Sequence, residues 1–276
     1  MESTRSKVLW IIGAVVILIW SIFPIFWIVM LSFKQPGEIG NQPGFFPKDW
    51  TWENYETVFS IDLFTSALIN SIGISLIATF IGVVFATLVA YAIARLEFPG
   101  KKIILSFALA IAMFPVVSLV GPLFNLWRDI GLYDTWPGLI IPYISFALPL
   151  AIWTLSAFFR EIPWEMEQAA QVDGATSWQA FRKVIVPLAA PGVFTAAILT
   201  FFFCWNDFVF GISLTSSDSA RPVPAALAFF TGESQFEAPT TAVSAAAVVV
   251  TVPVVIIVLL FQRRIVAGLT SGAVKG

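Results

Sequence analysis

Long runs of apolar residues recur along the chain and are separated by short polar stretches. A helix needs about 20 apolar residues to cross the hydrocarbon core of a membrane, and six runs meet or approach that length. These runs extend from Val8 to Phe33, Ser66 to Ala94, Ile103 to Leu126, Gly138 to Phe159, Gly192 to Leu214 and Ala242 to Phe261. The pattern predicts an all-α integral membrane protein with six transmembrane helices.

The polar stretches divide the chain into two parts. Residues 1–65 contain the first predicted helix and an outer segment, and residues 66–276 form a core domain with the other five. The outer segment from Lys34 to Ser60 is rich in proline and aromatic residues. Aromatic side chains concentrate at membrane interfaces, so we expect this segment to lie along the interface rather than to stack on a ligand.

The distribution of lysine and arginine predicts the orientation, because loops rich in these residues stay in the cytoplasm. Six crossings place both termini on one side. With the termini inside, the inner segments contain Arg5, Lys7, Arg95, Lys101, Lys102, Arg160, Arg182, Lys183, Arg263, Arg264 and Lys275. The outer segments then contain only Lys34, Lys48, Arg128 and Arg221. The bias predicts cytoplasmic termini.

Composition removes several classes of function. The chain is 58% hydrophobic and 12% charged, and its net charge of -2 argues against a nucleic-acid partner. It has no histidine and one cysteine, Cys204, which excludes His-dependent catalysis, His or Cys metal sites and an intrachain disulfide. We therefore expect no metal site and no enzymatic activity in this chain.

The polar segment 161–191, between the fourth and fifth predicted helices, carries the strongest local signals. Pro163 suits the first turn of a short helix, and Gly174 suits its C-terminal end. Thr176 or Ser177 can cap a second helix, which Pro187 is expected to end. On that second helix, one face carries Trp178, Phe181 and Ile185. Taken alone, such a hairpin either lies on lipid or docks on a protein partner.

The spacing of residues in this segment resembles the coupling loop of ABC importer permeases. That loop reads EAA, three residues, Gly, nine residues, Ile, one residue and Leu-Pro. The matching positions here are Gln168, Ala169, Ala170, Gly174, Val184, Val186 and Pro187. The family's glutamate is replaced by Gln168, although Glu167 precedes it.

Three further stretches are similar to the carbohydrate-uptake, maltose-type branch of that family. They are Asn70-Ser71 with YAIARLEFPG at 91–100, Trp205-Asn206-Asp207-Phe208, and the ending FQRRIVAGLTSGAVKG at 261–276. The resemblance implies the type I ABC importer transmembrane fold and a multi-pass location in the plasma membrane of a prokaryote.

The resemblance also implies partners and contact residues. The partners are a second permease subunit, two ATP-binding subunits and an extracellular or periplasmic sugar-binding protein, which the outer loop from Thr215 to Thr241 would contact. The chain has no GxxxxGK[ST] loop, so ATP and Mg²⁺ are expected on the partner subunits, with no cofactor on this chain. The implied coupling residues are Trp164, Glu167, Gln168, Ala169, Ala170, Asp173, Gly174, Phe181 and Pro187. The implied ATPase-contacting tail consists of Gly268, Leu269, Thr270, Gly272, Lys275 and Gly276.

A polar group within the fifth predicted helix suggests a substrate path. Charges inside a membrane are rare and usually face a cavity or a partner, so Asp207 with its neighbours Trp205 and Asn206 is the first candidate. Asn125 and Asn70, at or near the outer ends of their helices, are weaker candidates. Asp207 has two alternative roles, which are fixing helix packing and binding a proton or sodium ion in an ion-coupled transporter. Because lysine and arginine are absent from the interior of every run, a neutral substrate is favoured, and the family suggests a maltose- or trehalose-like sugar.

Overall fold

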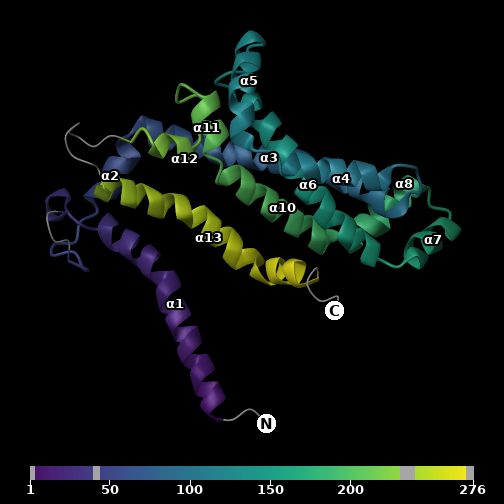
Figure 1. The fold of residues 1–276 in the computed structure, drawn as a ribbon, viewed down its shortest axis with the longest axis horizontal. Coiled ribbons are helices and arrows are strands. Elements are labelled where there is room, and N and C mark those ends of the chain that lie inside the picture. Colours follow the sequence, from purple (N-terminus) through teal and green to yellow (C-terminus); the bar gives the residue numbers. More distant parts are fainter. Residues whose placement is uncertain (1–3, 40–43, 231–239, 272–276) are drawn as a thin grey trace. The chain divides into compact units, whose positions relative to one another are not determined.

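The computed structural model describes residues 4–39, 44–230 and 240–271, and the side chains of 7–39, 44–230 and 240–262. All regular secondary structure in these residues is helical (Figure 1). The elements are α1 (Thr4–Ser32), η1 (Pro36–Glu38), α2 (Glu53–Ser60), α3 (Asp62–Arg95), α4 (Lys101–Ala112), α5 (Val116–Asp129), α6 (Trp136–Glu161), α7 (Trp164–Val172), α8 (Ser177–Ala180), η2 (Phe181–Ile185), α9 (Val186–Leu188), α10 (Ala190–Trp205), α11 (Val209–Leu214), α12 (Val223–Leu227) and α13 (Thr240–Ser271). The predicted all-α architecture is confirmed.

Four continuous helices are long and apolar enough to cross a membrane. They are Lys7–Ser32, Asp62–Arg95, Trp136–Glu161 and Thr240–Gln262. Two bent pairs raise the number of possible crossings in the described residues to six, if each pair is one span. The pairs are Lys101–Ala112 with Val116–Asp129, bent by 88°, and Ser177–Leu188 with Ala190–Trp205, bent by 73°.

The third and fifth predicted spans are therefore not straight helices. In the third, α4 ends at Ala112. Pro115 has an extended backbone with ψ of 112° and is the N-cap of the next helix, α5. Proline lacks a backbone N–H group and disfavours the α conformation in the residue before it, which explains the break. The fifth expected span, Gly192–Leu214, is divided into α10 and α11 by residues 206–208.

The density of internal contacts divides the chain into two compact units. The first comprises Met1–Thr65 and Ala226–Pro253, and the second comprises Ser66–Ala225 and Val254–Gly276. The boundary between residues 65 and 66 coincides with the division expected from the sequence. The sequence did not indicate that residues 226–253 group with the N-terminal part. The coupling segment and the substrate-path candidates all belong to the second unit.

The second unit packs α6 along α10, with α3 and η2 contributing to the same core. One buried cluster joins Ala90 of α3, Leu155 and Phe159 of α6, and Ile185 of η2. Gly192 permits the close approach of α10 to α6, because an added Cβ would lie 2.4 Å from the Phe158 ring. A larger side chain at this position would force the two helices apart.

In the first unit, aromatic residues surround the end of α1. The Phe33 ring centroid lies 4.9 Å from that of Trp52 and 5.5 Å from that of Trp50. The Asn54 amide donates hydrogen bonds of 2.9 and 2.7 Å to the backbone carbonyls of Ser32 and Lys34. The outer segment is thus tied to the last turn of α1 by ring contacts and a buried amide.

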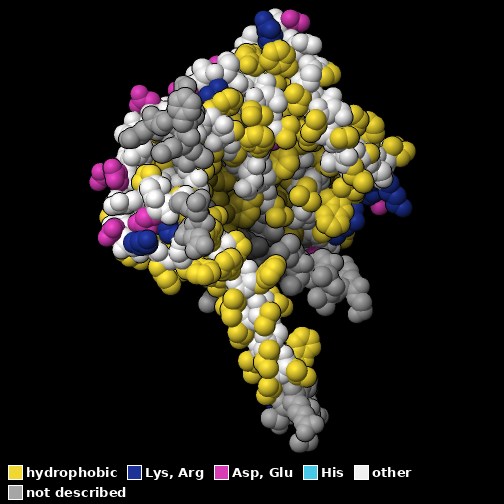
Figure 2. Space-filling view, turned by 60° about the vertical axis from the view of Figure 1, so that its left-hand side comes forward, with side chains coloured by type: hydrophobic (Ala, Val, Ile, Leu, Met, Phe, Trp, Pro, Cys, Tyr) yellow, Lys and Arg dark blue, Asp and Glu magenta, His cyan; other side chains and the backbone are white. Residues whose placement is uncertain are grey.

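Apolar side chains dominate the exposed surface. Trp10 and Trp20 of α1 are 73% and 82% exposed, and no residue of α4 is buried. Figure 2 shows hydrophobic side chains over much of the visible face, with charged side chains gathered in a few groups near its edges. Such a surface is stable in lipid or against other subunits, and not in water.

Candidate functional site

The coupling segment begins with α7, whose ends follow capping rules. Pro163 occupies the N-cap rather than the first turn, and Glu165 and Glu167 lie in the first turn, where negative charge is favourable. The helix ends in the left-handed turn that the sequence predicted, with φ of +88° at Gly174. The Gly174 N–H bonds to the Gln171 carbonyl at 3.0 Å, and the Ala175 N–H bonds to the Ala170 carbonyl at 2.9 Å. These two bonds form a Schellman motif.

The second helix of the segment begins with a capping box. Thr176 accepts a hydrogen bond from the Gln179 N–H, and the Gln179 side chain accepts one from the Thr176 N–H. The helix widens into a π-helical turn at η2 and continues through α9 to Leu188. Pro187 therefore does not end it, because proline is tolerated in the first turn of α9, where a backbone N–H is not required.

The coupling residues divide into an exposed group and a buried group. Gln168, Ala169, Asp173, Gly174 and Pro187 are exposed, Trp164 is half-exposed, and Ala170 is partly exposed. These residues can meet a partner subunit.

Glu167 and Phe181 are each 5% exposed, so they pack within the chain in this arrangement, and their part in coupling stays a prediction. Glu167 accepts a hydrogen bond from the Tyr91 hydroxyl. The Phe181 ring packs 4.6 Å from the Tyr91 ring. Both side chains point toward α3 because a buried carboxylate needs a donor and a buried ring needs apolar neighbours.

Sequence reasoning missed the α3 residues that receive α7. Arg95 is 4% exposed, donates a hydrogen bond to the Ile162 carbonyl and lies 4.6 Å from the centre of the Trp164 ring. The YAIAR stretch was used only for resemblance, and Arg95 only for orientation. Tyr91 and Arg95 are four residues apart on a helix, a spacing that places both on one face.

Asp207, the first substrate-path candidate, is bonded within the chain. Its Oδ2 atom accepts hydrogen bonds from the Tyr143 hydroxyl at 3.1 Å and from the Gly211 N–H at 3.0 Å. The second bond holds the carboxylate at the N-terminal end of α11, where negative charge is stabilising. This geometry favours the packing role of Asp207.

The neighbours of Asp207 differ in exposure. Trp205 is 3% exposed, and its ring stacks on that of Phe201 with the centroids 5.5 Å apart, which favours a packing role. Asn206 is exposed, and its amide donates to the Phe202 carbonyl at 2.8 Å. Asn125 is also exposed on α5. Asn206 and Asn125 thus remain available to a ligand.

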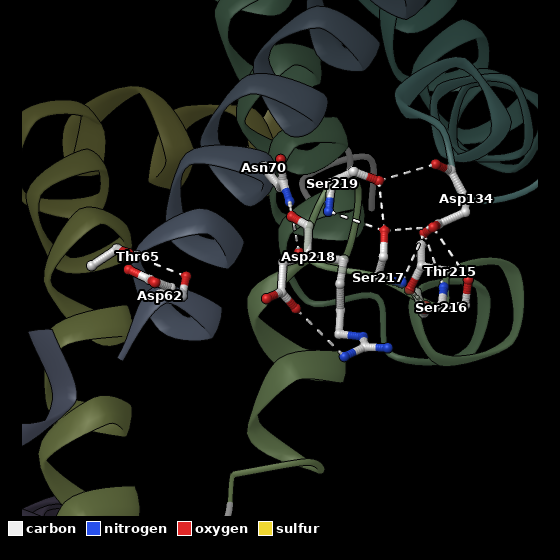
Figure 3. Close-up of polar contacts among 11 residues, drawn as sticks. Asp62, Thr65, Asn70, Asp134, Thr215, Ser216, Ser217, Asp218 and Ser219 are labelled. Atoms are coloured by element: carbon white, nitrogen blue, oxygen red, sulfur yellow. Dashed lines mark hydrogen bonds and ion pairs between the residues drawn. The ribbon is translucent and has the colours of Figure 1, made fainter. Parts of the chain in front are cut away.

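Asn70 is buried and its side-chain amide binds a loop of the same chain, while its place on a substrate path stays a prediction. Its amide nitrogen donates to the carbonyls of Asp218 (Figure 3) and Arg221 at 2.8 and 3.1 Å. Its oxygen accepts from the Trp136 indole at 2.9 Å. The residue is 5% exposed, and its donor bonds to Asp218 and Arg221 both go to backbone carbonyls of the loop.

A second polar contact fixes the same loop. Asp134, with φ of 58°, accepts hydrogen bonds from the N–H groups and hydroxyls of Ser216 and Ser217 (Figure 3). Partial burial tends to raise the pKa of Asp134, but the hydrogen bonds from Ser217 and Ser216 outweigh it and lower that pKa. The loop 215–222 is therefore held by Asn70 on α3 and by Asp134 before α6.

A small cavity of about 30 Å³ lies between α6 and α10. Thr154 and Thr200 supply its only hydroxyls among an otherwise apolar lining. A volume of this size accommodates about one water molecule and no sugar. A path for a larger solute thus requires more than this cavity.

The expected ATPase-contacting tail is only partly described. Gly268, Leu269 and Thr270 lie in the last turns of α13, and their side chains lie outside the described residues. Gly272, Lys275 and Gly276 lie outside the described residues altogether.

Comparison with known proteins gives consistent matches. Residues 78–270 match the family described as binding-protein-dependent transport system inner membrane component. The trehalose transport system permease protein SugB of Mycobacterium tuberculosis (strain CDC 1551 / Oshkosh) is 58% identical over 272 residues, 99% of each chain.

A more distant relative and a solved structure agree with this match. The trehalose/maltose transport system permease protein MalG of Thermococcus litoralis is 39% identical over 277 residues, covering 100% of this chain and 99% of the relative. The structure of a bacterial ABC transporter that imports the acidic polysaccharide alginate contains a similar chain, with a TM-score of 0.81 and 24% identity. The match covers 95% of this chain and 98% of that chain. The structural likeness extends over nearly the whole chain.

Proposed function

The chain belongs to the family of binding-protein-dependent transport system inner membrane components, and from this premise we propose that it is one permease subunit of an ATP-driven sugar importer. It is a multi-pass membrane protein with the type I ABC importer fold. Its role is to form part of the translocation path and to pass movement between that path and separate ATPase subunits.

One observation carries the proposal, which is the exposed turn between α7 and α8. Gln168, Ala169 and Asp173 are exposed around Gly174, and the Schellman bonds and the capping box fix the backbone on both sides of the turn. Alanine has only a methyl side chain and glycine has none, so a partner surface can approach the backbone closely. A rigid, exposed and small-residue turn is suited to docking in a groove of another protein, and its position between α6 and α10 suits it to moving both.

The proposal assigns the chemistry of ATP to other subunits. Two ATPase subunits bind ATP and Mg²⁺, and the turn around Gly174 contacts one of them. A second permease covers part of the exposed apolar surface and completes the path, since the cavity between α6 and α10 is only about 30 Å³. An extracellular or periplasmic binding protein delivers the sugar to the face that contains the loop 215–222.

The proposed contact between the coupling segment and an ATPase also implies an orientation of the chain in the membrane. The coupling segment contains Arg182 and Lys183, both exposed, and an ATPase is a cytoplasmic protein. We therefore place this segment and both termini in the cytoplasm. Asn70, Asp134 and loop 215–222 then lie at the outer side.

The substrate class rests on relatives. The two relatives described above are named as trehalose and trehalose/maltose permeases. We propose a neutral disaccharide of this kind, with Asn206 and Asn125 as the exposed amides nearest to a path.

Ion-coupled transport by Asp207 is the weaker alternative. The Oδ2 atom of Asp207 already accepts bonds from Tyr143 and Gly211, so this carboxylate has donors within the chain that compensate for its burial without a cation.

Uptake of labelled trehalose and maltose into proteoliposomes tests the proposal. The transporter is purified from its native membranes through a tag on this chain, together with its bound subunits. We expect uptake that requires ATP inside the vesicle when the sugar-binding protein is outside. Uptake of both sugars at the rate of empty vesicles would refute the sugar assignment.

A further inference from the structure

Glu167 is the only buried residue of α7. A carboxylate is costly to bury unless a donor compensates for its lost hydration. Here the donor is the hydroxyl of Tyr91, in the last turn of α3. The helix that carries the exposed coupling face is therefore attached to a transmembrane helix through a charge-assisted hydrogen bond, a strong class of contact.

Arg95, the last residue of α3, attaches the start of α7 to α3 one turn beyond Tyr91. Its guanidinium donates to the carbonyl of Ile162 and packs on the ring of Trp164. Ile162 and Trp164 flank Pro163, the N-cap of α7. Two side chains one turn apart on α3 thus hold α7 at two points, which restrains both its position and its direction.

Aromatic packing extends this attachment to the second helix of the coupling segment. Phe181 lies 4.6 Å from Tyr91 and 5.2 Å from Trp178, measured between ring centroids. Phe181 begins the π-helical turn η2 that leads toward α10. Tyr91 therefore contacts α7 through its hydroxyl and the second helix through its ring.

Two polar atoms in the cluster formed by Tyr91, Arg95 and Glu167 make no hydrogen bond within the described residues. The Nε atom of Arg95 and the Oε2 atom of Glu167 are buried without a hydrogen-bond partner in the part of the chain that the structure describes. An unpaired buried polar atom destabilises a fold, so these two atoms weaken the cluster rather than strengthen it.

We propose that Tyr91, Arg95 and Glu167 form the joint through which movement of the coupling segment reaches α3, an inference that rests on the proposed function. The α7–α8 turn receives the movement from the ATPase, and the joint converts it into movement of a helix that extends from Asp62 to Arg95. The three side chains are positioning residues, because they contact neither sugar nor ATP.

The variant Tyr91→Phe tests the joint. It removes the hydroxyl that bonds Glu167 and keeps the ring that packs on Phe181. In the purified transporter in proteoliposomes, we expect trehalose-stimulated ATP hydrolysis and trehalose uptake to fall about tenfold, the effect of losing one hydrogen bond to a charged group. Basal ATP hydrolysis and the amount of ATPase bound to the tagged chain should remain unchanged.

Tyr55→Phe is the matched control, because it also removes a tyrosine hydroxyl bonded to a side chain, that of Ser32, at 2.7 Å. Its stimulated activity should equal that of the wild type. A second pair compares Glu167→Gln, which keeps an acceptor for Tyr91, with Glu167→Ala, which does not. We expect the glutamine variant to retain stimulation within about threefold and the alanine variant to lose it.

The proposal is overturned if Tyr91→Phe is stimulated like the wild type, or if Glu167→Gln loses as much stimulation as Glu167→Ala. Absence of stimulated hydrolysis in the wild-type transporter would instead refute the proposed function. The two failures are therefore distinguishable.

Discussion

Substitutions at Gly174 can distinguish two causes of lost coupling, which are strain in the backbone of the turn and a clash with a partner subunit. The residue has φ of +88°, and, apart from its two chain neighbours, no atom of the described residues lies within 4 Å of an added Cβ. A side chain at this position therefore meets no clash within the chain, and the penalty is the left-handed conformation, about 1–2 kcal/mol for a residue other than glycine. Such a penalty reduces the population of the native turn by about 5- to 30-fold if the turn can relax.

Three substitutions at Gly174 impose increasing backbone strain. Asparagine tolerates the left-handed region, alanine does so poorly, and β-branched valine does so worst. If strain alone decides, sugar-stimulated ATP hydrolysis falls in the order Gly174→Asn, Gly174→Ala, Gly174→Val. If a partner closely contacts the turn, as we propose, even Gly174→Asn abolishes stimulation because its side chain projects into the interface. The assay is stimulated ATP hydrolysis in proteoliposomes, normalised to the assembled complex.

Gly100 provides the matched control. It has φ of +86°, and no atom lies within 4 Å of an added Cβ, but it precedes α4 and lies outside the coupling segment. Gly100→Asn should leave stimulation intact. Full stimulation in Gly174→Val would refute the reasoning, as would an equal loss in the asparagine variants at positions 100 and 174.

Three further predictions concern the path and the outer loop. Asp207→Asn should change sugar uptake by less than about threefold, because an amide oxygen can still accept from the Tyr143 hydroxyl. Asp207→Ala should lower the melting temperature, because it leaves that buried hydroxyl unpaired. A tenfold loss of uptake in Asp207→Asn would restore the substrate role of Asp207. Asn70→Ala should increase proteolysis of loop 215–222 by releasing two carbonyls, each worth about 1 kcal/mol, and an unchanged cleavage rate would contradict this. The folded-state pKa of Asp134 is lowered, so its stabilisation is present above the unfolded pKa of about 4 and is lost as pH falls through the folded value. Melting temperatures between about pH 6 and about pH 2 should therefore fall less steeply in Asp134→Asn, and parallel curves would contradict this.

The sequence predicted those features that depend on composition and local capping. Apolar runs identified the membrane helices, and the positions of Gly174 and Thr176 correctly predicted the turn between α7 and α8. Both signals are local, since a left-handed residue or a cap is determined by its immediate neighbours.

Features that depend on tertiary contacts were predicted less well. The direction in which Glu167 points depends on Tyr91, 76 residues away. The hydrogen bonds of Asn70 likewise join it to segments distant in sequence, namely Trp136 and the loop 215–222. A polar residue in an apolar run shows that a partner is needed, and it does not show whether that partner is a substrate or the chain itself.

The most direct test of the central claim measures the energy source of transport. The tagged chain is purified with its bound subunits and reconstituted, and labelled trehalose uptake is measured with and without internal ATP, each in the presence and absence of ionophores. The account predicts that ATPase subunits co-purify with the chain and that uptake requires ATP and is unaffected by ionophores. Uptake by the chain without ATP, driven by an ion gradient and abolished by ionophores, would contradict it.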